Sequence, residues 1–112
     1  GLATSGQMDN VSMVLYELDL RRYFDVLITG EQVTRGKPDP ESFLLAAKGL
    51  KLEPTSCVVF EDSFAGVAAA LAAGCKCVAL ATTHTETELT EVAPHIIVTN
   101  FRSLSVADLN DL

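Results

Sequence analysis

The sequence predicts an α/β fold in which helices flank a parallel β-sheet, and three features near its centre carry this prediction. Four apolar residues at 57–60 have the pattern of a strand buried on both faces. Ser63 can cap a helix at residues 64–73, which are mostly Ala and Val, and Gly74 then suits the left-handed position that ends a helix. A second apolar run at 75–80 completes a strand–helix–strand unit, and such a crossover between parallel strands is right-handed.

The rest of the chain continues this alternation of strands and helices, which is typical of a parallel α/β sheet. The apolar spacing and the turn residues predict, in chain order, a strand end at 1–4, a helix at about 8–19, a strand at 25–29, a helix from 40, a short helix at 86–92, a strand at 96–98 and a helix at 105–112.

The helix that starts at Pro40 is predicted in most detail. Proline is favoured at the first helical position, and Glu41 beside it suits the positive end of the helix dipole. The expected buried face of this helix consists of Phe43, Leu44, Ala46, Ala47 and Leu50.

Length and charge set limits on the function. We expect one domain over residues 1–112, because 112 residues allow a single small core. No apolar run approaches the length of about 18 residues that a membrane span needs. The net charge of −7 argues against nucleic acid and anionic membranes as partners. An anionic substrate would therefore need a local positive group, such as a metal ion or a placed lysine.

Three cysteines, an odd number, together with the lack of a secretory signal predict a reducing compartment, which we take to be the cytoplasm. Cys75 and Cys77 alternate along one predicted strand and share a face. A metal or redox role would call for a second Cys/His pair, so we interpret both as small buried hydrophobic residues.

Polar side chains follow successive predicted strands at the point where each strand ends. They are Thr4 and Ser5, Lys37, Glu61 and Asp62, and the loop 82–84. Because the carboxyl ends of parallel strands share one edge of the sheet, we expect these side chains to converge there. Hydroxyls, a lysine and two carboxylates suit a phosphate group and a magnesium ion. His84 lies in the last of these loops and is better placed for a ligand than His95.

Each of these residues also has an ordinary structural interpretation. Thr4 can simply end a strand, and Ser5 can cap the next helix. Lys37 alone would be read as a solvated loop lysine. Glu61 can be exposed, and Asp62 can cap the helix that follows. Only the combination favours a binding site.

The order and spacing of these motifs resemble the haloacid-dehalogenase-like hydrolase superfamily, in particular its β-phosphoglucomutase-like phosphatases and phosphomutases. The similar segments are GLATSG at 1–6, GKPDPESFLLAAKGL at 36–50 and VVFEDSFAGVAAALAAG at 58–74, of which the last two are specific.

The resemblance implies a role for each site residue. Thr4 would hydrogen-bond the transferring phosphoryl group together with Ser5, and Lys37 would offset its negative charge. Glu61 and Asp62 would help to hold Mg²⁺, with Asp62 as the direct ligand. The substrate would be a small phosphorylated metabolite, such as a sugar phosphate.

The resemblance also shows what the sequence lacks. The family's reaction passes through an aspartyl-phosphate formed by the first Asp of a D-x-D strand, and no D-x-D fits here. In the family that strand lies between the strands ending here at Phe60 and Thr4. We therefore expect a chain cut from something longer, without the cap domain, whose sheet a missing N-terminal segment or a second chain completes. The 112 residues alone are predicted to be inactive.

Two other classes of protein remain as alternatives. A phosphorylated receiver domain also uses acidic residues, a Thr or Ser and a Lys-Pro pair, but in a different order along the chain. A non-catalytic α/β binding or interaction module would keep the fold and lack the nucleophile.

Overall fold

Two small β-sheets form the framework of the computed structural model, which describes residues 1–112, and all their strand pairs are parallel. In the first sheet β1 (Leu2–Ala3) pairs with β2 (Leu27–Ile28). In the second, the order is β3 (Val58–Glu61), β4 (Lys76–Leu80) and β5 (Ile96–Val98). The predicted α/β fold with parallel strands is confirmed, and its strands are divided between two sheets.

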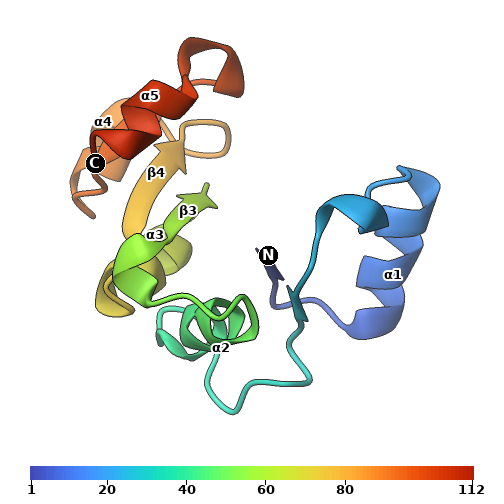
Figure 1. Cartoon of the computed structure of the whole chain (residues 1–112). Coiled ribbons are helices and arrows are strands. Elements are labelled where there is room, and N and C mark those ends of the chain that lie inside the picture. The colour runs from blue at the N-terminus through green and yellow to red at the C-terminus, as the bar shows by residue number, and fades with distance from the viewer.

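Helices cover the strands. The α-helices are α1 (Met8–Glu17), α2 (Glu41–Gly49), α3 (Phe64–Ala72), α4 (Glu86–Thr90) and α5 (Val106–Asn110), and the 3₁₀ turns are η1 (Arg21–Tyr23), η2 (Pro54–Ser56) and η3 (Phe101–Ser103). Figure 1 shows α1 on one side of the molecule and α3, α4 and α5 on the other, with α2 between them. Helix α2 contacts β1 and β2 as well as α3, so it joins the two halves. None of the helices combines the length and the apolar character needed to cross a bilayer.

The core lies where α3 packs on β4, and it is built from small residues. Ala69 and Ala70 of α3 and Cys77 of β4 are completely buried. Alanine extends only to Cβ, so the helix can approach the strand closely at normal packing density. Cys75 and Cys77 are both buried, as the sequence predicted, and burial raises the pKa of both thiols, to about 12 for Cys77.

Local signals at the ends of α3 are confirmed. The Ser63 hydroxyl oxygen accepts a hydrogen bond from the Gly66 amide at 3.0 Å, which satisfies one of the free N–H groups of the first turn. At the other end Gly74 has a φ angle of +85°, the left-handed conformation that its position after the helix requires.

Helix α2 corrects two predictions. Pro40 is the N-cap residue and the helix begins at Glu41, one residue later than predicted, while the Asp39 carboxylate accepts a bond from the Glu41 amide at 3.0 Å. Leu44, which the sequence predicts on the buried face, is 43% exposed. It lies one turn before the exposed Lys48, so it belongs to the flank of the helix and not to the face toward the sheets.

A cavity of about 410 Å³ separates β1 from β3, and 13 of its 15 lining residues are hydrophobic. We call this cavity the slot. It is bordered by β1 and β3 and by α2, with Ala3, Val58, Phe60, Phe43 and Ala46 among its lining residues. The two sheets are not hydrogen-bonded to each other across it.

The strand edges at the slot carry unpaired backbone groups. On β1 the amides of Leu2 and Thr4 donate toward the β2 side, so Ala3 between them points its N–H toward the slot. On β3 the Cys57 carbonyl accepts from β4, so Val58 and Phe60 point their backbone groups away from β4.

Replacing Gly74 by Ala tests the helix end. No atom lies within 4 Å of the position that a Cβ would occupy, so the expected loss of about 1–2 kcal/mol in unfolding free energy comes from the backbone conformation alone. Urea denaturation measures it, with Gly36→Ala as the control. A Cβ at Gly36 also meets open space, and there the change should be neutral or slightly stabilising. Equal losses in the two variants would contradict this explanation.

Candidate active site

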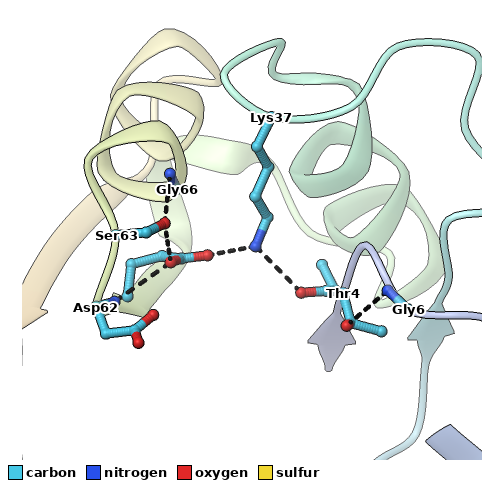
Figure 2. Close-up of polar contacts among 8 residues, drawn as sticks. Thr4, Gly6, Lys37, Asp62, Ser63 and Gly66 are labelled. Carbon is cyan, nitrogen blue, oxygen red and sulfur yellow. Dashed lines mark hydrogen bonds and ion pairs between the residues drawn. The ribbon is translucent and has the colours of Figure 1, made fainter. Parts of the chain in front are cut away.

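Lys37 connects the two sheets. It lies in the loop between β2 and α2, and its Nζ donates a hydrogen bond to the Ala3 carbonyl of β1 at 3.3 Å and forms an ion pair with Glu61 of β3 (Figure 2). Nζ also lies 4.8 Å from the centre of the Phe43 ring, within the range of a cation–π interaction. The Lys37 side chain is only 15% exposed, so the interpretation as a solvated loop lysine is wrong.

Both carboxylate oxygens of Glu61 have bonding partners within the protein. One carboxylate oxygen pairs with Lys37, and the other accepts hydrogen bonds from the Asp62 amide and the Ser63 hydroxyl, each at 3.3 Å. Its side chain is 9% exposed, which excludes the alternative of an exposed glutamate. A buried carboxylate needs such partners, because an unpaired charge in the interior is very costly.

Gly66 makes room for this carboxylate. It lies in the first turn of α3, and a Cβ at this position would overlap the carboxyl group of Glu61. Figure 2 shows Gly66 directly beyond Ser63 on this side of the site. No sequence pattern singles out Gly66 within an Ala-rich helix, because the close approach comes from a side chain on the neighbouring strand.

Asp62 has a different environment from Glu61, although the two residues are adjacent. It is exposed, and one of its carboxylate oxygens accepts a hydrogen bond from the Thr83 hydroxyl at 3.2 Å. Ser63, and not Asp62, caps α3, so the alternative role of Asp62 as a helix cap is excluded. Its carboxylate therefore lies at the surface with capacity for a further partner.

Thr4 lies across the site from the acidic pair, on the other side of Lys37 (Figure 2). Its hydroxyl oxygen accepts a hydrogen bond from the Gly6 amide at 3.1 Å, which fixes the side chain. A hydroxyl that accepts in this way keeps its own O–H to donate to a ligand. Ser5 beside it is exposed and lines the same open cavity as Thr4, at the carboxyl ends of the strands.

The predicted convergence at the carboxyl ends of the strands is observed. An open cavity of about 680 Å³ is lined by Thr4, Ser5, Lys37, Glu61, Asp62 and Thr82. Thr99 and Asn100 also line it and were not predicted, although they follow β5 directly and the same strand-end argument would have found them. Phe101 of η3 lines it too, and this turn had no sequence signal.

The two histidines lie outside this cavity. The His84 ring stacks on the Phe64 ring with 4.1 Å between centroids, and its Nδ1 lies 3.6 Å from the Glu88 carboxylate. His95 accepts a hydrogen bond from the Cys77 amide at 3.0 Å through Nδ1, which ties it to β4. Both make contacts within the protein.

Glu41 holds the loop that carries Lys37. Its carboxylate accepts hydrogen bonds from the amides of Thr34 and Arg35, each at 2.8 Å. These bonds, first from Thr34 and then from Arg35, lower the pKa of Glu41 below its usual 4.5. The first residue of α2 therefore anchors the segment from which Lys37 reaches inward.

No group of three or more His, Cys, Asp and Glu side chains is placed to hold a metal ion by itself. The carboxylates at the site still fit a magnesium ion, because this ion keeps several waters and is commonly held by one or two carboxylates together with substrate phosphates. The exposed Asp62 carboxylate fits that coordination directly, whereas Glu61 is already bonded to Lys37.

Parallel strands with polar groups gathered at their carboxyl ends are typical of α/β proteins, in which ligands bind at that edge of the sheet. Comparison with known proteins specifies the class: a family model described as haloacid dehalogenase-like hydrolase matches residues 1–74. The chain belongs to this family of hydrolases.

Proteins similar to this chain include two phosphatases of phosphorylated compounds and a β-phosphoglucomutase. The chain is 46% identical over 91 residues to a validoxylamine A 7'-phosphate phosphatase from Streptomyces hygroscopicus subsp. limoneus, covering 81% of this chain and 43% of the relative. It is 51% identical over 73 residues to a phosphorylated carbohydrates phosphatase from Thermotoga maritima, covering 65% and 34%. The crystal structure of a β-phosphoglucomutase from Clostridium difficile superposes with a TM-score of 0.80 at 27% identity, covering 91% and 44%. The chain thus spans less than half the length of these proteins.

Replacing Lys37 by Met tests the ion pair. The change leaves the Glu61 carboxylate buried without its counter-charge, so we expect a loss of about 3–5 kcal/mol in unfolding free energy by urea denaturation. The matched control is Lys48→Met at the exposed last turn of α2, where the change should stay within about 0.5 kcal/mol.

The double variant Lys37→Met with Glu61→Gln measures the coupling free energy between the two charged side chains. Its loss should be smaller than the sum of the two single losses, because the coupling between contacting charges is then removed only once. Strictly additive losses would show that the two side chains do not stabilise each other.

Proposed function

We propose that this chain forms one side of the active site of a magnesium-dependent phosphatase or phosphomutase that acts on small phosphorylated metabolites, in particular sugar phosphates. The observation that carries the proposal is the placement of Thr4, Lys37 and Asp62 around one open cavity at the strand ends. The names of two similar proteins, phosphatases of a phosphorylated validoxylamine and of phosphorylated carbohydrates, support this substrate class.

Thr4 and Lys37 bind the phosphoryl group in this proposal. The Thr4 O–H donates a hydrogen bond to a phosphoryl oxygen while its oxygen stays bonded to the Gly6 amide. The Lys37 ammonium has three N–H donors, two of which serve Ala3 and Glu61. The third can point into the cavity, so the ion pair orients the lysine without using all of its donors.

Asp62 is the magnesium ligand in this proposal, and Glu61 acts mainly by holding Lys37. Magnesium supplies positive charge that stabilises the phosphoryl oxygens as negative charge develops on them. Thr83 orients the Asp62 carboxylate through its hydrogen bond of 3.2 Å. Ser5 adds a second hydroxyl on the phosphate side of the cavity.

The slot between β1 and β3 receives the strand that carries the nucleophile. The slot is apolar, and its borders offer the unpaired N–H group of Ala3 and the backbone groups of Val58 and Phe60 that face away from β4. A strand inserted there would bond to both sheets and join them, which removes two exposed edges. It would end beside Lys37 and Glu61, where a nucleophilic aspartate is needed for the aspartyl-phosphate route. The strand comes from a second chain or from another segment of a longer protein that contains these 112 residues. We call this longer protein the parent protein.

Hydrogen exchange tests the filled slot. We expect the amides of Ala3, Val58 and Phe60 to be protected in the parent protein and to exchange much faster in this chain. The Val59 amide faces β4 and is the control, because its protection should not depend on the slot. Fast exchange of Val58 and Phe60 in the parent protein would contradict insertion.

Thr4→Val in the parent protein tests the phosphate site. Removing a donor that acts on the transition state lowers kcat by about 100-fold, and phosphate release from a panel of sugar phosphates with Mg²⁺ measures it. Thr90→Val, on α4 and bonded to a backbone carbonyl of its own helix, is the control that should keep full activity.

The same assay distinguishes the competing function. A parent protein that binds these esters and releases no phosphate would be a non-catalytic binding module. The 112-residue chain by itself should release none, with or without a metal chelator. Magnesium-dependent release by the isolated chain would place a nucleophile within these residues and overturn the proposal for the slot.

A further inference from the structure

Cys57 and Cys75 lie opposite each other, directly before the neighbouring parallel strands β3 and β4. The register pairs Val58 with Lys76, and the Lys76 amide donates to the Cys57 carbonyl at 3.0 Å, so the pairing extends back to these two cysteines. Neighbouring strands are about 4.8 Å apart. This spacing lies within the Cα separations of about 4.4–6.8 Å that a disulfide spans.

The two side chains also share one environment. Both line the slot, and they lie close enough for the charge of one to affect the ionisation of the other. Cys57 is partly exposed, with its Sγ 3.5 Å from the Glu53 carbonyl, whereas Cys75 is 3% exposed. All three cysteines of the chain have free thiols in this structure.

Cys77 is less suited to pair with either thiol. It lies in β4, two residues after Cys75, at a separation of about 6.6 Å, near the upper limit for a disulfide. It is also completely buried and packs in the core beneath α3, out of reach of an oxidant.

We propose that Cys57 and Cys75 are a redox modification site that a small disulfide, of the class of oxidised glutathione, converts to a cross-strand disulfide. The Cys57 thiolate attacks one sulfur of the small disulfide and releases one small thiol, which leaves a mixed disulfide on Cys57. The Cys75 thiol then loses its proton and attacks the Cys57 sulfur, and the second small thiol leaves. The protein loses two hydrogen atoms and two electrons, and the small disulfide is reduced to two thiols.

The different exposures of the two thiols explain why Cys57 reacts before Cys75. The partly exposed Cys57 meets an oxidant more readily than Cys75, which is 3% exposed. Burial, with a further contribution from Cys57, raises the pKa of the Cys75 thiol, which also makes it the poorer first nucleophile. The disulfide would fasten β3 to β4 at the end of β3 opposite Glu61 and Asp62.

Peptide mapping of the folded parent protein tests the proposal. The reduced protein is treated with oxidised glutathione, its remaining thiols are blocked with an alkylating reagent, and it is digested with trypsin. Cleavage after Lys51 and Lys76 puts Cys57 and Cys75 in one peptide, residues 52–76, and Cys77 in the next. We expect the peptide 52–76 to lose the mass of two hydrogen atoms and to carry no alkyl group, while the Cys77 peptide is alkylated.

Variants make the test specific. Cys77→Ser should form the disulfide as the unchanged protein does. Cys75→Ser should stop at the mixed disulfide and carry one glutathione on Cys57. Alkylation of both cysteines in the peptide 52–76, a disulfide joining this peptide to the Cys77 peptide, or glutathione held on Cys75 of the unchanged protein would each overturn the proposal.

Discussion

The buried ion pair between Lys37 and Glu61 is the interaction on which the rest of the structure depends. It is the polar link between the two sheets, because Lys37 bonds to the Ala3 carbonyl of one sheet and to Glu61 of the other. Burying two charges costs several kcal/mol each, which their mutual attraction offsets only with good geometry and further hydrogen bonds. The amide of Asp62 and the hydroxyl of Ser63 supply those bonds. The pair is therefore better explained by a need for charge at this place than by stability alone.

The ion pair also places the adjacent carboxylates of Glu61 and Asp62 in different environments. Glu61 is enclosed by Lys37 and by the first turn of α3, whereas the Asp62 carboxylate faces the open cavity and accepts a hydrogen bond from Thr83. Because the Lys37 ammonium offsets the charge of the Glu61 carboxylate, the two adjacent carboxylates repel each other less. The apolar slot separates β1 from β3. The polar site lies at one end of this slot, next to the strand edges that carry unpaired backbone groups.

The sequence predicted those features that depend on local pattern. Apolar runs fixed the strands, Ser63 and Gly74 marked the ends of α3, and the strand-end argument gathered Thr4, Lys37 and the acidic pair at one edge. Features that depend on contacts between distant segments were missed. The burial of Glu61 requires the lysine of another loop, and the space at Gly66 is visible only once β3 packs beside α3. No periodicity in one segment can report either contact.

The most direct test of the central claim is a crystal structure of the parent protein with Mg²⁺ and a phosphate mimic such as tungstate. We predict the anion within hydrogen-bond distance of Thr4 and Lys37, with Lys37 still paired to Glu61 and the metal ion on Asp62. An anion bound elsewhere, or one for which Lys37 abandons Glu61, would contradict the account of the ion pair as the fixed frame of the site.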